Sequence, residues 1–227
     1  MKFSFEVPIS YLNYFHKYQD YLLVLSHLLP LPVYESYFLK KKKGMLSIID
    51  NAFNELQVPN TPEEMSRLFY KYQPTLVTSP DSDRWDTQQT VEAYIELKES
   101  VPNENILCLF KNLEEYYILR AKGCKHLGSS FWWRPHIKDF PSSRDIFYYG
   151  FLNFEEYRKY KPFYCDTGMP IKLALKGYTI EEWVEQDCFH IHSKDFTEYL
   201  HSVLDPKTLE LAEKNILTFK EICNGKL

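Results

Sequence analysis

The sequence predicts an α/β protein: a (β/α)8 barrel of the TIM type followed by a small helical C-terminal extension. Three observations lead to this fold class. Short apolar runs of strand length recur eight times along the chain, helical patterning separates most of them, and the spacing between runs is too long for hairpins. Eight parallel strands joined by helical crossovers close into a barrel. The alternative, a flavodoxin-like open sheet, normally has about five or six strands and a glycine-rich first turn, and neither is evident.

The predicted strands are short runs of apolar residues, many of them β-branched or aromatic. In chain order they are residues 3–7, 21–26, 45–50, 75–80, 105–110, 125–130, 145–151 and 162–166. Two of these strands end in an aspartate, the third in Asp50 and the eighth in Asp166. Because the carboxyl end of every barrel strand faces the active site, both residues are functional candidates.

The helices between the strands are recognised by their capping residues. Four of them begin with Thr or Asn followed by glutamates in the first turn, at Thr61, Asn112, Asn153 and Thr179. Asp86 suits the start of a fifth helix, and Gly123 suits the end of the helix that follows Asn112. From residue 178 onward the chain is helical and charged. We therefore expect one domain over residues 1–227, with the barrel in 1–177 and a helical part in 178–227.

Composition bounds the function classes. A hydrophobic fraction of 44% in 227 residues is enough for one large core, so the chain is not a disordered protein. The net charge of −4 excludes a binder of nucleic acid that relies on overall basic charge. Nucleic-acid contact would need local patches, such as residues 40–43, 134–138 or 158–161, each of which also suits ordinary solvated surface.

The five cysteines are odd in number and mostly in apolar surroundings, which favours reduced thiols in a cytoplasmic protein. The longest apolar stretch, residues 21–34, is interrupted by His27, Pro30 and Pro32 and is too short to span a bilayer. We therefore expect a cytoplasmic protein without a membrane partner, and the sequence leaves its oligomeric state open.

Residues with chemical function gather at four predicted strand ends. The segments are Asp50-Asn51-Ala52-Phe53-Asn54-Glu55, Ser79-Pro80-Asp81, Gly128-Ser129 and Asp166-Thr167 with Pro170 and Lys172. Taken in this order, they resemble motifs of the tRNA-guanine transglycosylase superfamily. The resemblance is greater to its short DNA-modifying branch, the phage and bacterial 7-deazaguanine DNA transglycosylases. It covers nearly the whole chain through motifs that are individually short.

The resemblance implies that two carboxylates perform the chemistry. Exchange of a base at C1′ with retained geometry calls for a carboxylate nucleophile and a second acid/base group. Asp166 would be the nucleophile that forms a covalent glycosyl ester, and Asp50 would move protons on the leaving and entering bases. Each residue also has a structural alternative, since Asp50 suits a helix cap and Asp166 suits a turn.

The same resemblance implies a binding set. Asp81 would bind the amidine edge of the base, although it also suits a turn, and Asn51, Gly128 and Ser129 would offer further base contacts. Phe53 would stack on a base that has left the helix. The phosphate contacts would come from a basic rim composed of Lys172, Arg134 and Lys138.

The implied function is a pentosyltransferase, a glycosyltransferase that exchanges guanine in a nucleic acid for a 7-deazaguanine base. DNA is preferred over tRNA because the chain is short and has no appended RNA-binding domain. Two alternatives remain: a non-catalytic barrel that binds a nucleobase or nucleotide, and an N-glycoside hydrolase that uses the same carboxylates. If phage-encoded, the protein would act in the host cytoplasm.

The chain departs from the family pattern at several positions, among them the tail of the sixth strand at residues 131–135. Ala52 stands where the family has glycine, and the fifth strand ends in Lys111 where the family commonly has a Gln-Gly base contact. The tRNA enzymes bind a structural zinc, but Cys188, His190 and His192 with the distant Cys223 lack that spacing. We therefore expect no cofactor, and zinc is the alternative.

Overall fold

The computed structural model describes residues 1–129, 148–150, 163–185 and 199–225. Eight parallel strands form one sheet in the order β1-β8-β7-β6-β5-β4-β3-β2. They are β1 (Lys2–Phe5), β2 (Leu22–Leu25), β3 (Ser47–Asp50), β4 (Leu76–Thr78), β5 (Ile106–Phe110), β6 (His126–Ser129), β7 (Tyr148–Gly150) and β8 (Tyr164–Thr167). Every predicted strand is present, and the prediction of a TIM-like α/β fold is confirmed.

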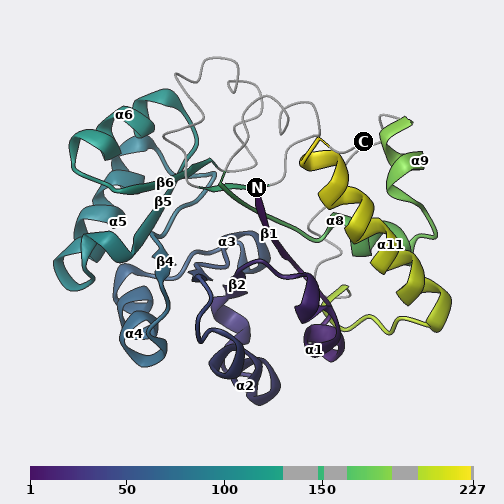
Figure 1. The fold of residues 1–227 in the computed structure, drawn as a ribbon. Helices are drawn as coiled ribbons and strands as arrows, with labels where there is room; N and C mark the ends of the chain where they lie inside the picture. The colour runs from purple at the N-terminus through teal and green to yellow at the C-terminus, as the bar shows by residue number, and fades with distance from the viewer. Residues whose placement is uncertain (130–147, 151–162, 186–198, 226–227) are drawn as a thin grey trace.

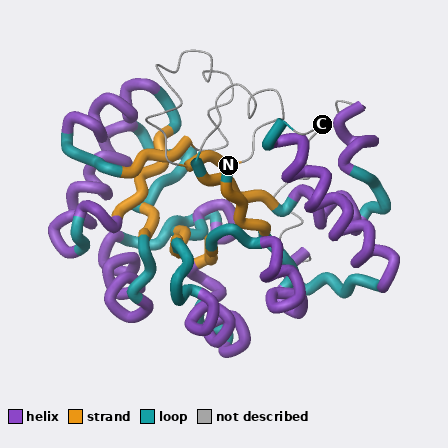
Figure 2. The backbone as a smooth tube through the Cα atoms, in the orientation of Figure 1, coloured by secondary structure: helices purple, strands orange, loops and turns teal. Residues whose placement is uncertain are grey.

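The helices lie around the outside of the strands (Figures 1 and 2). The α-helices are α1 (Leu12–Phe15), α2 (Pro32–Lys41), α3 (Phe53–Leu56), α4 (Pro62–Tyr72), α5 (Thr87–Ser100), α6 (Leu113–Ala121), α8 (Met169–Leu175), α9 (Ile180–Glu185) and α11 (Pro206–Cys223). Short 3-10 helices cover Ile9–Tyr11, His16–Tyr18, Ser26–Leu28 and Asn103–Asn105. Within the described ranges, no helix combines the length and apolar character needed to cross a bilayer.

The predicted capping residues do begin these helices. Thr61 and Asp86 form capping boxes with Glu64 and Gln89 at α4 and α5, so that each pair satisfies two backbone amides. The side chain of Asn112 accepts a hydrogen bond from the backbone N–H of Glu115 at the start of α6. Gly123 follows α6 with φ 87°, a conformation that favours glycine. The cap predicted at Asn153 lies outside the described residues.

Side chains on the strands alternate between two cores. Tyr21, Ile48, Leu76 and Leu107 form a buried cluster inside the barrel, with Leu109 and Tyr164 packed against it. The residues between them on the strands face outward, into a larger core shared with the helices. Since residues two positions apart on a strand face the same side, this alternation determines which strand-end side chains enter the barrel.

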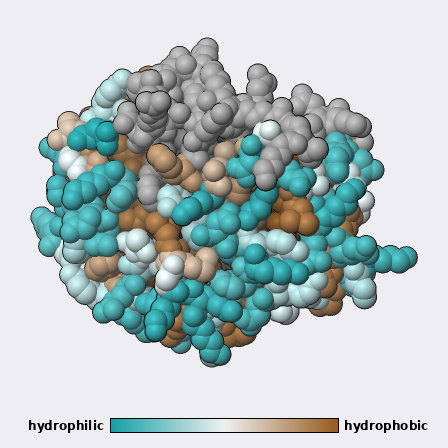
Figure 3. Space-filling view, in the orientation of Figure 1, coloured by the Kyte–Doolittle hydropathy of each residue, from teal (hydrophilic) through white to brown (hydrophobic). Residues whose placement is uncertain are grey.

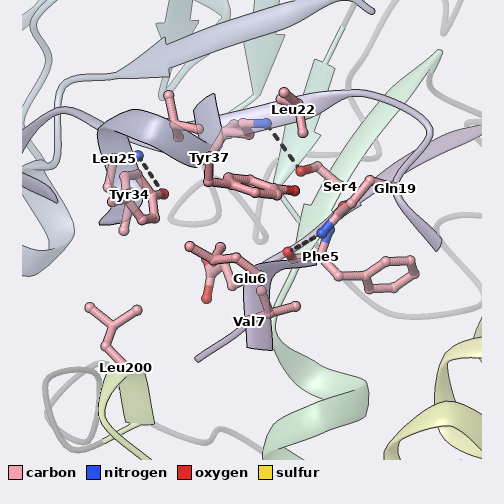
Figure 4. A pocket seen from close by; sticks show the side chains of 13 residues that line it. Ser4, Phe5, Glu6, Val7, Gln19, Leu22, Leu25, Tyr34, Tyr37 and Leu200 are labelled. Carbon is pink, nitrogen blue, oxygen red and sulfur yellow. Dashed lines mark hydrogen bonds between the residues drawn. The ribbon is translucent and has the colours of Figure 1, made fainter. Parts of the chain in front are cut away.

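β1 and β2 stand at the two ends of the strand order, and side chains join them. The Gln19 side chain mimics a neighbouring strand: its Oε1 accepts from Phe5 N at 2.6 Å, and its Nε2 donates to Phe5 O at 2.8 Å. Ser4 Oγ accepts from Leu23 N at 3.1 Å. Asp20 bonds Phe3 twice, once through its backbone N and once through Oδ2. We call this set of contacts the seam; part of it appears in Figure 4.

The predicted helical extension is present as α9 and α11. α11 lies against α8, at the right of Figure 1. Asn215, fully buried in α11, donates to the carbonyls of Pro170 and Tyr178 and accepts from the backbone of Ile180. On the face that Figure 3 shows, the coloured residues are mostly hydrophilic, with hydrophobic residues in separate areas among them.

Candidate active site

Three carboxylates enter the barrel at the carboxyl ends of its strands. Asp50 lies two residues after the inward Ile48 on β3, and Asp166 two residues after the inward Tyr164 on β8. Glu6 directly follows β1, whose Ser4 is the register partner of Asp166. By the two-residue period, all three side chains point toward the same mouth of the barrel.

Asp50 is held by the backbone that follows it. Its Oδ2 accepts from Ala52 N at 2.8 Å, and Thr78 Oγ1 lies 3.5 Å from its Oδ1. Burial, helped by the negative charge of Glu6, raises the pKa of Asp50 to about 6 against the opposing effect of the hydrogen bond from Ala52. A carboxyl with such a pKa can give and take a proton near neutral pH.

The turn after Asp50 is built from residues in a left-handed conformation. Ala52 has φ 57° and Gln57 has φ 60°, and between them α3 makes a single turn. Each such non-glycine residue costs roughly 1–2 kcal/mol, so the surrounding contacts must hold the turn in place. Ala52 is fully buried and stands where the resemblance pattern has glycine. The positive φ of this position explains why glycine would suit it.

Asp81 is buried and paired with an amide. Only 7% of Asp81 is exposed, and its Oδ1 accepts from Asn51 Nδ2 at 2.6 Å. The same amide nitrogen donates to Ser79 O at 3.1 Å, while Asn51 Oδ1 accepts from Phe53 N. Burial raises the pKa of Asp81 to about 7, against the influence of the Asn51 hydrogen bond. Asn51 therefore orients Asp81 and leaves the second carboxyl oxygen to other partners.

Glu55 on α3 is a further carboxyl at this mouth. Burial raises its pKa to about 8, and the charges of Asp50, Glu6 and Asp166 add to the shift. Its Oε2 is buried without a hydrogen-bond partner among the described residues. The charges of Asp50, Glu6 and Asp166 act on Glu55, so its pKa of about 8 leaves it mostly protonated at neutral pH.

Lys172 is occupied by an ion pair. Its Nζ lies 3.2 Å from Glu6 Oε2 and 4.9 Å from the centre of the Tyr199 ring. Gly168 makes room for this pair, because a Cβ there would lie 2.8 Å from Glu6 Oε2. To make the predicted phosphate contact, Lys172 would therefore have to give up its ion pair with Glu6. Arg134 and Lys138, the other residues of the predicted basic rim, lie outside the described residues.

The remaining predicted base contacts are placed differently. Gly128 pairs in register with Leu109 and faces the barrel interior. Ser129 pairs with Phe110, is 1% exposed and faces the outer core, so its side chain lies on the opposite side of β6. Phe53 is 5% exposed and does not present an open ring for stacking. These orientations cannot be predicted from the sequence, because strand boundaries are predicted only to within a residue or two. A shift of one residue moves each side chain to the opposite face of the strand.

Two residues of the mouth were missed as site candidates. Glu6 comes at the end of the first strand, the same signal that identified Asp50, but it was hidden within an apolar run. Glu55 was noticed only as part of a motif. Glu6 also lines a cavity of about 30 Å³ beside the seam, where Figure 4 shows it between Tyr37 and Leu200. That volume holds about one or two waters, and the cavity is lined mostly by apolar side chains.

The described residues contain no group of three potential metal ligands close enough to hold an ion. Cys188, His190 and His192 lie outside them, and the side chain of Cys223 is buried in the core. The prediction of no cofactor therefore stays a prediction.

No protein-family model matches the chain, and no curated protein matches it. Among solved structures, the chain is similar to a monomeric form of phosphoribosylanthranilate isomerase from Thermotoga maritima. The two share 11% identity over 94% of this chain and 98% of that one, with a TM-score of 0.45. So distant a likeness carries no argument about activity.

The predicted membership of the tRNA-guanine transglycosylase superfamily is wrong, because no comparison links the chain to those enzymes. The physical reason lies in the motifs. Strand-end aspartates, a capped first turn and Pro-Asp loops recur on (β/α)8 barrels of many activities, so their order identifies the fold rather than the family. Any function must therefore be argued from the site itself.

Proposed function

We propose that this barrel is a glycosyltransferase that acts on the N-glycosidic bond of a purine nucleotide. More specifically, we propose that it exchanges guanine in DNA, in preference to tRNA, for a 7-deazaguanine base. The supporting observation is the placement of carboxyls with contrasting surroundings at one mouth: the inward Asp50 and Asp166 at strand ends, and the amide-paired Asp81 beside them. The proposal rests on this chemistry and on no family relationship.

The two inward carboxylates suit a two-step displacement. Asp166 attacks C1′ and forms a glycosyl ester as the C1′–N9 bond breaks, while Asp50 gives a proton to the departing base. The entering base then transfers a proton to Asp50, attacks C1′ and releases Asp166, so that protons and electrons balance over the cycle. A raised pKa suits the acid/base role of Asp50, since the group must be protonated in one step and ionised in the next.

Asp81 suits recognition of the base. A guanine edge presents two donors, N1–H and the exocyclic amine, and a carboxylate accepts both. Asn51 fixes one oxygen of Asp81 at 2.6 Å, so the carboxyl plane is set before a ligand arrives.

Exchange of radiolabelled guanine out of duplex DNA, with and without a free 7-deazaguanine, tests the proposal. We expect release that depends on the added base. Asp166→Asn should lose activity by at least about a thousandfold and should yield no DNA adduct that survives denaturation. Asp50→Asn should slow base release, and Asp83→Asn, an exposed aspartate of the neighbouring loop, should act as the wild type does.

Release without uptake of the added base would replace exchange by hydrolysis. Neither release nor exchange, on DNA or tRNA, would overturn the enzymatic proposal. Full activity of Asp166→Asn would show that another group is the nucleophile.

A further inference from the structure

Lys111 is a largely enclosed cation that holds together the loop after β4. Its Nζ donates to the carbonyls of Ser82 at 2.7 Å and Trp85 at 2.8 Å, and lies 3.2 Å from Thr90 Oγ1. The fourth partner is Glu115 Oε1 at 3.3 Å. Lys111 thus joins the end of β5, the start of α5 and the start of α6 to one loop.

The negative partner is buried even more completely. The side chain of Glu115 is 0% exposed and that of Lys111 is 12% exposed. Glu115 Oε2 also accepts from Lys111 N at 2.7 Å, so that both atoms of the carboxyl are engaged by the same residue. An ion pair withdrawn from water in this way is costly unless hydrogen bonds complete it. Backbone carbonyls do so for Lys111, and the backbone N–H of Lys111 does so for Oε2 of Glu115.

The loop that Lys111 holds is the one that carries Asp81. Asp81 directly precedes Ser82. The carbonyl of Ser82 accepts hydrogen bonds from Lys111 Nζ and from the backbone N–H of Trp85, and Ser82 Oγ accepts from the backbone N–H of Arg84. On its other side, Asp81 is fixed by Asn51. The loop is therefore held at two places, by the Asn51 amide at the Asp81 carboxyl and by the Lys111 cation at the carbonyls of Ser82 and Trp85.

We propose that Lys111 is a positioning residue for base recognition: by binding the Ser82 and Trp85 carbonyls, it fixes the carboxyl of Asp81 for the amidine edge of guanine. The ligand named here rests on the proposed function.

The charges around Asp81 give the proposal a second readout. Asp50, Lys111, Glu115 and the buried thiol of Cys108 are the titratable groups that interact with it. The positive charge of Lys111 lowers the pKa of Asp81, and the negative charge of Glu115 raises it by a smaller amount. Removing both charges should therefore raise the pKa of Asp81.

The test uses the full chain with Lys111→Met and Glu115→Gln together, so that no unpaired carboxylate is left buried. Lys98→Met is the matched control, since Lys98 Nζ also donates to a backbone carbonyl, that of Lys122, but at an exposed site. Amide hydrogen exchange of residues 82–86 reports the loop, and calorimetry with guanine and hypoxanthine reports recognition. Circular dichroism establishes that each variant is folded.

In the double variant we expect the loop amides to exchange at least about tenfold faster. Guanine should lose at least about tenfold in affinity, and its preference over hypoxanthine, which lacks the exocyclic amine, should shrink to about threefold or less. The midpoint of the pH profile of guanine binding should move upward. Lys98→Met should match the wild type in every measurement.

Unchanged exchange of the loop amides in a folded double variant overturns the proposal whatever the binding data show. Faster exchange with an unchanged guanine preference and pH midpoint also overturns it, because the loop would then be stabilised without serving recognition. If the wild type binds no guanine, the proposed function fails, and the exchange measurement still decides whether Lys111 positions the loop of Asp81.

Discussion

Burial is the largest influence on the pKa of each raised carboxyl at the mouth, Asp50, Asp81 and Glu55. A group displaced from water favours its neutral form, and nearby carboxylates add to this preference. These carboxyls therefore lower the stability of the fold at neutral pH, because the folded chain must hold charges that water would solvate more readily.

The stability of the protein should reflect this in its pH dependence. The pKa of Asp81 is about 7 in the folded chain and near 3.8 in the unfolded chain, so between these values the folded state binds more protons. Stability should thus fall as pH rises from about 4 to 7, by up to about 4 kcal/mol from this group, and then level off.

Urea unfolding at pH 5, 6, 7 and 8 measures this effect. Asp81→Asn keeps the shape but cannot ionise, so its stability should decline less than that of the wild type over this range. Parallel pH profiles for the two proteins would show that Asp81 is not the titrating group.

The strand-end rule predicted Asp50, Asp81 and Asp166 at the mouth, because the end of an apolar run is visible in a sequence. The partners of these residues were not visible. Lys111 and Ser82 are 29 positions apart, and only the folded chain shows that they meet. Likewise, no local pattern distinguishes the inward Gly128 from the outward Ser129.

At the scale of the element, helix starts were predictable and the left-handed positions at helix ends were only partly so. Side chains at Thr61, Asp86 and Asn112 bond amides two or three residues away, which makes capping a local event. Glycine at position 123 announces a left-handed residue. Glutamine and alanine give no such signal, so the left-handed conformations of Gln73 after α4 and Ala52 before α3 could not be predicted.

Gln73 offers a direct measure of such strain. It is exposed at the end of α4 with φ 46°, and its N–H bonds Phe69 O. Gln73→Gly should stabilise the protein by about 0.5–1 kcal/mol, since glycine removes the left-handed strain and loses part of the gain to its freedom in the unfolded chain.

Chemical denaturation gives the free energy of unfolding for this comparison. The reciprocal change, Gly123→Ala after α6, should destabilise the protein by about 1 kcal/mol. A loss of stability in Gln73→Gly would mean that the glutamine side chain makes a compensating contact.

At the scale of the whole molecule, the barrel is closed by the seam between β1 and β2. Phe5 depends on Gln19 for both backbone hydrogen bonds on that side. Gln19→Ala should therefore cost about 2 kcal/mol of stability, because two partly buried backbone groups lose their partners together.

Gln88→Ala is the control, since Gln88 is exposed on α5 and its side chain donates a hydrogen bond to Glu92 on the same helix. It should stay within about 0.5 kcal/mol of the wild type in equilibrium unfolding. Equal stabilities for the two variants would mean that the seam contributes nothing to closure.

The seam also bears on how the chain assembles as it is made. β1 leaves the ribosome before its ladder partner β8, which begins at residue 164 and at ordinary synthesis rates follows roughly ten to thirty seconds later. Gln19 and Asp20, by contrast, lie only 14 and 17 residues beyond the amides they bind. We expect these side chains to cover the edge of β1 that faces β2 while the opposite edge waits for β8, so that the nascent strand exposes one open edge instead of two.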